Sequence, residues 1–220
     1  NRKPLVGLYT YTAGNPLSAV KALFEAIEDL QNKGGIHFTI KGVGTTGSGR
    51  SFVGKIIGAD LILDEITTHA RAAYELKPET DTIIEIGGQD AKFTLMHNGR
   101  VTFSQMNTVC AAGTGSFIEE QARKLGCSLN DYSSKAAYAD APMASDRCTV
   151  FMESDLNSHQ QKGADIPDLV GGLAYSIVQN YIQKVVGDKP IGEKIFFQGG
   201  VTNNKAVVAA FEKITGKSII

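Results

Sequence analysis

The most informative stretch of the chain reads Thr82-Ile83-Ile84-Glu85-Ile86-Gly87-Gly88-Gln89-Asp90. Its first five residues are nearly all apolar, which is typical of a central strand buried on both faces. Glycine has no side chain to block a ligand, so the pair that ends the strand lets backbone amides approach phosphate oxygens or a ribose. The stretch therefore predicts a buried strand followed by a turn that could bind a ligand.

A second glycine pair, Gly199-Gly200, follows a second apolar run that ends at Gln198. A helix is expected over residues 203–215, and its N-terminal dipole would favour an anion near this turn. Either glycine pair alone could be only a tight turn. Two pairs, each after a central strand, favour a phosphate-binding site in which Glu85 and Asp90 could hold Mg²⁺, directly or through water.

The rest of the chain alternates strands and helices. Asn98-Gly99 separates apolar runs at 91–96 and 101–106, which predicts a two-residue hairpin turn. Further strands are expected at residues 5–9 and 36–40. Helices are expected over residues 16–34, 64–76, 116–125, 149–161 and 167–186, the third opened by a capping box of Ser116 and Glu119.

These elements predict an α/β protein with a mixed sheet covered by helices. Pro78 is the expected domain junction, dividing the chain into residues 1–77 and 78–220. The length of 220 residues suits one large or two small domains.

Composition excludes several classes of protein. The chain has 22 Lys and Arg against 23 Asp and Glu, a net charge of -1, and 42% hydrophobic residues. A disordered or collagen-like chain is excluded, and a near-neutral charge gives no attraction for nucleic acid. We expect no membrane span and no secretory signal, since neither pattern is present, and therefore a cytoplasmic protein.

Three cysteines, an odd number, argue against a disulfide framework. Cys110 and Cys148 each come just before an expected helix, and a helix N-terminus favours the thiolate that binds metal. Cys127 follows Gly126 at the end of a helix and is expected to be structural.

Cys110 and Cys148 allow two interpretations. Both could be small buried hydrophobic residues. No Cys-x-x-Cys pair and no suitable histidine spacing supports a zinc site, and no nucleophile elbow supports a hydrolase. Two thiolates from each of two copies would supply the four ligands of a [4Fe-4S] cluster, which would require a dimer.

Four segments together carry a resemblance to one family. They are residues 85–90, Asn107-Thr108-Val109-Cys110-Ala111-Ala112-Gly113-Thr114-Gly115, Cys148-Thr149-Val150-Phe151 and Gly199-Gly200-Val201-Thr202-Asn203. The chain resembles the activators of 2-hydroxyacyl-CoA dehydratases and their relatives among benzoyl-CoA reductase ATPase subunits, the BadF/BadG/BcrA/BcrD type. The resemblance runs from Pro4 to Ile219.

This resemblance implies the actin-like ATPase fold, of ribonuclease H-like type, which sugar kinases and Hsp70 chaperones share. It implies a homodimer in which Cys110 and Cys148 of both copies hold one [4Fe-4S] cluster. ATP hydrolysis would change the angle between the helices at the cluster. One low-potential electron, supplied by a ferredoxin or flavodoxin, would then pass to a dehydratase or a benzoyl-CoA reductase.

The same resemblance assigns the nucleotide residues. Glu85, Gly87 and Gly88 would form the second phosphate motif, with Gln89 and Asp90 as its catalytic residues. The adenosine motif would consist of Gly199, Gly200 and Asn203.

The chain departs from the family pattern at two points. Shorter members usually have Asp where this chain has Glu85, which weakens the magnesium role of that residue and favours the long, multi-module relatives. The strand, hairpin and phosphate loop that normally open the first domain would precede Asn1, so that domain is expected to be truncated. We therefore expect this span alone to bind ATP poorly; tight binding of Mg-ATP in calorimetry would contradict this.

Two other functions remain open at the level of sequence. One is a sugar or acyl kinase of the same fold, although no residue stands out as its catalytic base. The other is a non-catalytic regulatory module of a larger polypeptide.

Overall fold

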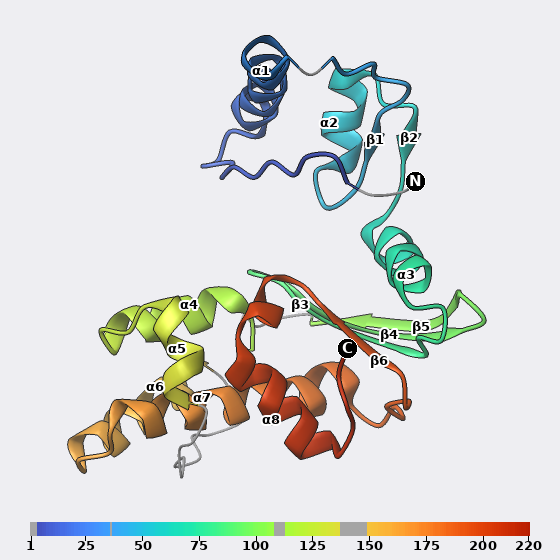
Figure 1. Ribbon diagram of the computed structural model, residues 1–220. Helices are drawn as coiled ribbons and strands as arrows, with labels where there is room; N and C mark the ends of the chain where they lie inside the picture. Colours follow the sequence, from blue (N-terminus) through green and yellow to red (C-terminus); the bar gives the residue numbers. More distant parts are fainter. Residues whose placement is uncertain (1–3, 36, 108–112, 137–148) are drawn as a thin grey trace. The chain divides into compact units, whose positions relative to one another are not determined.

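The computed structural model describes residues 4–35, 37–107, 113–136 and 149–220 (Figure 1). Contacts divide the chain into two units, residues 1–69 and 70–220. The division falls within helix α3 (Glu65–Leu76), and the junction expected at Pro78 lies shortly after that helix. The assignment of the two parts as a partial first and a second actin-like domain stays a prediction.

Helix α1 (Pro16–Gly34) of the first unit starts and stops as its sequence predicts. The Asn15 side chain accepts a hydrogen bond from the Ser18 amide at 3.1 Å, and proline occupies the first turn, where its missing amide hydrogen costs nothing. Gly35 ends the helix in the left-handed conformation, with φ of 62°.

The first unit also has a small parallel sheet of β1 (Gly44–Thr45) and β2 (Leu61–Ile62), connected by helix α2 (Arg50–Ile57). Gly54 of α2 comes so near this sheet that an added Cβ would lie 2.7 Å from the Thr45 hydroxyl oxygen. The helix can pack against the sheet at this point because the residue is glycine.

The prediction of strands at residues 5–9 and 36–40 is wrong. The described residues of these segments, 5–9 and 37–40, form no strand. An isolated extended segment has no ladder of hydrogen bonds, and neither segment pairs with another strand in this unit. Leu5 is 86% exposed and Tyr9 is 82% exposed. Apolar alternation alone therefore did not produce a strand.

The second unit contains a four-stranded mixed sheet in the order β5-β4-β3-β6. The central strand β3 (Thr82–Ile86) runs antiparallel to β4 (Ala91–His97) and parallel to β6 (Ile195–Gln198). Every residue of β3 is buried, as its apolar run predicts. The edge strand β5 (Arg100–Met106) runs antiparallel to β4.

The predicted hairpin between β4 and β5 is confirmed. Asn98 and Gly99 form its turn with φ of 49° and 74°, the left-handed values of a type I′ turn. This turn type matches the twist of the two strands and places His97 opposite Arg100, before an irregularity between Leu95 and Met96 shifts the register.

Helices cover one face of this sheet (Figure 1). They are α4 (Gly115–Lys124), α5 (Leu129–Ala136), α6 (Thr149–Gln161), α7 (Ile166–Tyr181) with its π-helical end η1 (Ile182–Val186), and α8 (Lys205–Thr215). Ile84 and Ile86 face these helices in the main core, whereas Ile83 packs with Ala70 and Ala73 in a separate, smaller cluster. The two sets alternate along β3, as the period of a strand requires.

Two helix starts differ from the sequence prediction. Ser116 and Glu119 form no capping box, because α4 begins at Gly115 with Thr114 as its N-cap and Ser116 lies inside the helix. Helix α8 begins at Lys205 rather than at residue 203, and Asn204 caps it through hydrogen bonds from the amides of Ala206 and Val207.

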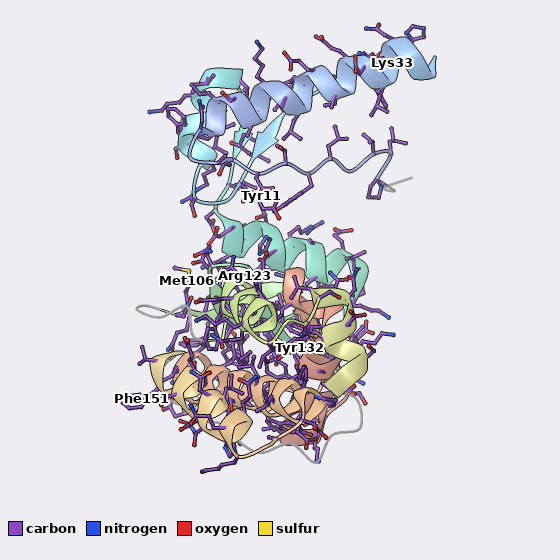
Figure 2. The ribbon with its side chains drawn as sticks, turned by 90° about the vertical axis from the view of Figure 1, so that its left-hand side faces the viewer. Tyr11, Lys33, Met106, Arg123, Tyr132 and Phe151 are labelled. Atoms are coloured by element: carbon purple, nitrogen blue, oxygen red, sulfur yellow. The ribbon has the colours of Figure 1, made fainter. Side chains whose placement is uncertain are left out.

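Helix α5 was missed because it is only eight residues long and polar. Its start is held by Ser128, whose hydroxyl accepts from the Asp131 amide at 3.1 Å. Its Tyr132 is buried in the helical layer, whereas Phe151 of α6 is exposed at its outer surface (Figure 2). Among the described residues no helix combines the length and the hydropathy that a bilayer span needs.

Candidate functional site

Two glycine turns lie side by side at the ends of the neighbouring parallel strands β3 and β6. The first glycine turn, residues 87–90, follows Ile86; the second, residues 199–200, follows Gln198. Gly199 has φ of 100°, and an added Cβ would collide with the Ile86 carbonyl oxygen. Only glycine fits here, because both the backbone angle and the space exclude a side chain. Carboxyl ends of parallel strands are a usual place for a ligand in α/β proteins.

The N-terminus of α4 packs against the first turn and beside the residue that directly follows the second turn. The Gly115 amide donates to the Gly87 carbonyl at 2.8 Å, and the Ser116 amide donates to the Gly88 carbonyl at 2.9 Å. An added Cβ on Gly115 would lie 3.3 Å from a Val201 methyl carbon, just after the second turn. Three segments far apart in the sequence therefore meet at one place, and movement of the first turn would be transmitted to α4.

The first glycine turn is closed by a hydrogen bond from the Gly87 amide to the Asp90 carbonyl at 2.8 Å. Gly88 and Gln89 are exposed at its tip, and Asp90 is half-buried. The side chains of Gln89 and Asp90 therefore stand where a bound ligand could reach them. Their catalytic roles stay predictions.

The second turn continues into a short 3-10 helix, η2 (Gly200–Asn203). Asn203 is exposed, and its side-chain amide donates to the Gly200 carbonyl at 3.3 Å. The side chain of Asn204 already accepts hydrogen bonds from two amides at the start of α8. Fewer free amides therefore remain at this helix N-terminus for an anion than the sequence led us to expect. Ligand contacts at this turn would come from Gly199, Gly200 and Asn203.

Glu85 lies one row below the glycines and is engaged by two side chains. The Lys92 ammonium lies 2.9 Å from one carboxylate oxygen, and the Gln198 amide donates to the other at 2.7 Å. Glu85 is 7% exposed and Lys92 is 5% exposed. A magnesium ion needs accessible oxygen ligands and keeps several waters, so Glu85 in this arrangement does not fit a direct ligand. In the described part of the chain, no three His, Cys, Asp or Glu side chains form a metal site.

Sequence reasoning did not find Lys92 and Gln198. The length of the turn between β3 and β4 could have indicated Lys92. A four-residue turn places Glu85 opposite Lys92 in the antiparallel register. A lysine on a buried strand needs an acidic partner, and Glu85 is the cross-strand neighbour that supplies one.

A buried tyrosine supports the same part of the sheet. The Tyr181 hydroxyl at the end of α7 donates to the Lys92 carbonyl at 2.6 Å. Burial raises the pKa of Tyr181 well above its ordinary value, so this hydroxyl stays protonated and keeps donating.

The predicted cluster ligands Cys110 and Cys148 lie outside the described residues. The described flanks agree with helices starting nearby, because α4 begins at Gly115 and α6 begins at Thr149. Cys127 is a free, buried cysteine whose thiol donates to the Ser128 carbonyl at 3.5 Å. It packs in the main core, in agreement with a structural role.

Solved structures define the class of this protein. The activator of the 2-hydroxyisocaproyl-CoA dehydratase from Clostridium difficile, with bound ADPNP, matches with a TM-score of 0.77 at 34% identity, over 90% of this chain and 73% of that one. Component A of the (R)-2-hydroxyglutaryl-CoA dehydratase of Acidaminococcus fermentans matches with a TM-score of 0.78 at 32% identity, over 97% of this chain and 79% of that one. The expected actin-like ATPase fold is confirmed.

The particular family follows from the sequence. Residues 10–220 match the BadF/BadG/BcrA/BcrD ATPase family, and the chain belongs to that family. A relative with a known role is the (R)-2-hydroxyglutaryl-CoA dehydratase activating ATPase of Acidaminococcus fermentans, 34% identical over 219 residues, which are 99% of this chain and 80% of that protein. The resemblance drawn from the glycine and cysteine motifs is therefore confirmed.

Proposed function

We propose that this chain is an ATP-dependent activator that passes a low-potential electron to a 2-hydroxyacyl-CoA dehydratase or a related enzyme of CoA substrates. The observation that carries the proposal is the meeting of both glycine turns with the start of α4 in a member of this ATPase family. Relatives of the chain act as activators of such dehydratases. A benzoyl-CoA reductase subunit is among them.

The nucleotide would lie against backbone rather than side chains. Gly87 and Gly88 would approach its phosphates, and Gly199 and Gly200 its adenosine, with Asn203 as a polar contact. Gln89 and Asp90 are the side chains placed to orient a water molecule or a metal at the phosphates. Glu85 would not touch the nucleotide; it would help to hold strand β3, and with it the first glycine turn, in place.

Cys110 and Cys148 of two copies would hold one [4Fe-4S] cluster, which supplies one-electron chemistry when bound. Thiolates are the required ligands, and helix N-termini stabilise them. Two cysteines from each copy complete four ligands only in a homodimer. A ferredoxin or flavodoxin would be a suitable electron donor.

The contacts of α4 suggest how a nucleotide would influence the cysteine region. The first glycine turn holds the amides of Gly115 and Ser116, and Cys110 precedes them by only a few residues. A shift of Gly87 on nucleotide binding or hydrolysis would therefore pull on the start of α4. Small shifts of a helix are a common way to convert binding into a change elsewhere in a protein.

Iron and acid-labile sulfide in anaerobically prepared protein test this proposal. We expect a brown dimer with about four irons per two chains. Cys110→Ser and Cys148→Ser should each lose most of the iron. Cys127→Ala is the matched control, because it also removes a thiol but should keep the iron.

Other outcomes favour other functions. A colourless monomer with sugar-dependent ATP turnover would indicate a kinase of the same fold. A colourless protein without ATP turnover would indicate a regulatory module. Equal iron loss in all three cysteine variants would contradict the assignment of Cys110 and Cys148.

A further inference from the structure

Gln198, Glu85 and Lys92 form one row across three strands. Glu85 of β3 is paired with Lys92 of β4 in the antiparallel register and with Gln198 of β6 in the parallel register. Residues directly opposite each other on neighbouring strands project to the same face of a sheet. We call these three side chains the Glu85 row.

The Glu85 row is held together by direct polar contacts. One oxygen of the carboxylate faces the Lys92 ammonium at 2.9 Å, and the other accepts from the Gln198 amide at 2.7 Å. The side chain of Glu85 is 9% exposed and that of Lys92 is 6% exposed. Charges this far from water are tolerated only when they are paired and hydrogen-bonded, so each member depends on the others.

The row lies immediately below both glycine turns. Glu85 is separated from Gly87 by one residue, and Gln198 directly precedes Gly199. Lys92 belongs to the strand that the first turn leads into. Beyond this row β3 and β6 are no longer paired, and the contact between Gly199 and the Ile86 carbonyl allows little change in their spacing. The pair of Glu85 and Gln198 is therefore the last cross-link between β3 and β6 before the two glycine turns begin.

Magnesium binding at Glu85 would disturb this arrangement. A direct Mg²⁺ ligand must offer an accessible oxygen at about 2.0–2.1 Å within a nearly ideal octahedron. Both oxygens of Glu85 already have a partner, and one partner is itself a cation. An ion approaching Glu85 would meet the repulsion of the Lys92 ammonium, whereas half-buried Asp90 lies in the turn itself.

We propose that Glu85 is a positioning residue and not a metal ligand: Lys92 is its permanent counter-ion, and the Glu85 row fixes the spacing of the two glycine turns. This inference rests on the proposed function for the identity of the ligand at those turns. The pairing of the three side chains does not depend on the proposed function.

A double-mutant cycle of Glu85→Gln and Lys92→Met tests the pairing without any nucleotide. Lys92→Met should raise the unfolding equilibrium constant at least about a hundredfold, because it leaves a buried carboxylate unpaired. In the Glu85→Gln background the same change should have a much smaller effect. Equal effects in both backgrounds would overturn the pairing.

Magnesium distinguishes a counter-ion from a metal site in the same cycle. Urea unfolding in EDTA and in excess MgCl₂ should shift wild type and the Glu85→Gln/Lys92→Met double variant equally. Selective stabilisation of wild type by MgCl₂ would overturn the proposal, since it would mean that the ion binds Glu85. This comparison remains decisive if the chain binds no nucleotide, an outcome that would count against the proposed function instead.

Nucleotide binding gives the functional readout. The ratio of ADP affinities with and without Mg²⁺ should be nearly the same in wild type and in the double variant, because neither Glu85 nor Lys92 binds the ion, while loss of a direct Mg²⁺ ligand would lower the ratio strongly. Gln198→Leu should weaken ADP binding in both conditions alike, and Gln198→Glu at a pH that protonates the new carboxyl should restore part of it. A loss that appears only with Mg²⁺ would contradict the positioning role.

Discussion

Residues 5–9 and strand β3 have similar apolar sequences, but only β3 forms a buried strand. Thr82–Ile86 is buried at every position between two partner strands. Residues 5–9 pair with no strand in their unit and are exposed throughout. The difference shows that an apolar run supplies only the propensity for a strand, because the hydrogen-bond ladder comes from its neighbours. Four sets of variants would break or sharpen this comparison.

The largest effect is expected in the core. Ile84→Ala should destabilise the protein by about 2–5 kcal/mol, because Ile84 is fully buried and its removal leaves a cavity. Leu5→Ala is the matched control and should change stability by less than about 0.5 kcal/mol. Urea unfolding measures both, and a large effect of Leu5→Ala would mean that residues 5–9 are packed after all.

The next effect is expected where β3 and β6 end. Gly199→Ala should cost about 1–3 kcal/mol, because alanine is strained at φ of 100° and meets the Ile86 carbonyl. An added Cβ on Gly88 meets nothing within 4 Å, so Gly88→Ala should cost clearly less. Similar losses in thermal unfolding would indicate that the two turns are not in close contact.

A buried tyrosine should show a dependence on pH. Tyr181→Phe removes the donor to the Lys92 carbonyl and should cost about 1–2 kcal/mol at neutral pH. Because burial raises the folded-state pKa above the ordinary value of 10.0, the stabilisation is complete below about pH 10 and is lost as the pH rises further.

The matched control for this pH profile is Tyr9→Phe, which alters an exposed side chain. Denaturant midpoints between pH 7 and 11, an interval chosen to bracket roughly the tyrosine range, should fall less steeply in Tyr181→Phe than in wild type. An identical profile in both would contradict the buried hydroxyl.

The smallest effects are expected at the helix caps. Asn15→Ala should cost about 0.5–1 kcal/mol and Asn204→Ala somewhat more, because Asn15 accepts from one amide and Asn204 from two. Asn203→Ala should leave the stability of α8 nearly unchanged. Circular dichroism during thermal unfolding measures these losses, and a larger effect at Asn203 than at Asn204 would contradict the assignment of Asn204 as the cap.

The sequence was sufficient for features that depend on near neighbours. Asn98-Gly99 specified the hairpin through its backbone angles, and Asn15-Pro16 specified the start of α1. The burial of β3 followed from its continuous apolar run.

Features that depend on distant segments could not be read in the same way. The contact of Gly115 with the first glycine turn joins residues 87 and 115, and the Gln198–Glu85 bond spans 113 positions. The choice of Asn204 over Asn203 as a cap depends on the 3-10 turn before α8, which two adjacent asparagines do not reveal. The glycine pairs were found because their backbone role is local, whereas the partners of Glu85 required the register.

Nucleotide control of the cysteine region is the central claim of this account, and the rate of iron removal by a chelator tests it directly. The anaerobic protein should release iron to the chelator at clearly different rates in saturating ADP and in saturating Mg-ATP, because the first glycine turn is bonded to the start of α4. Equal rates, in a protein shown by calorimetry to bind both nucleotides, would contradict the account.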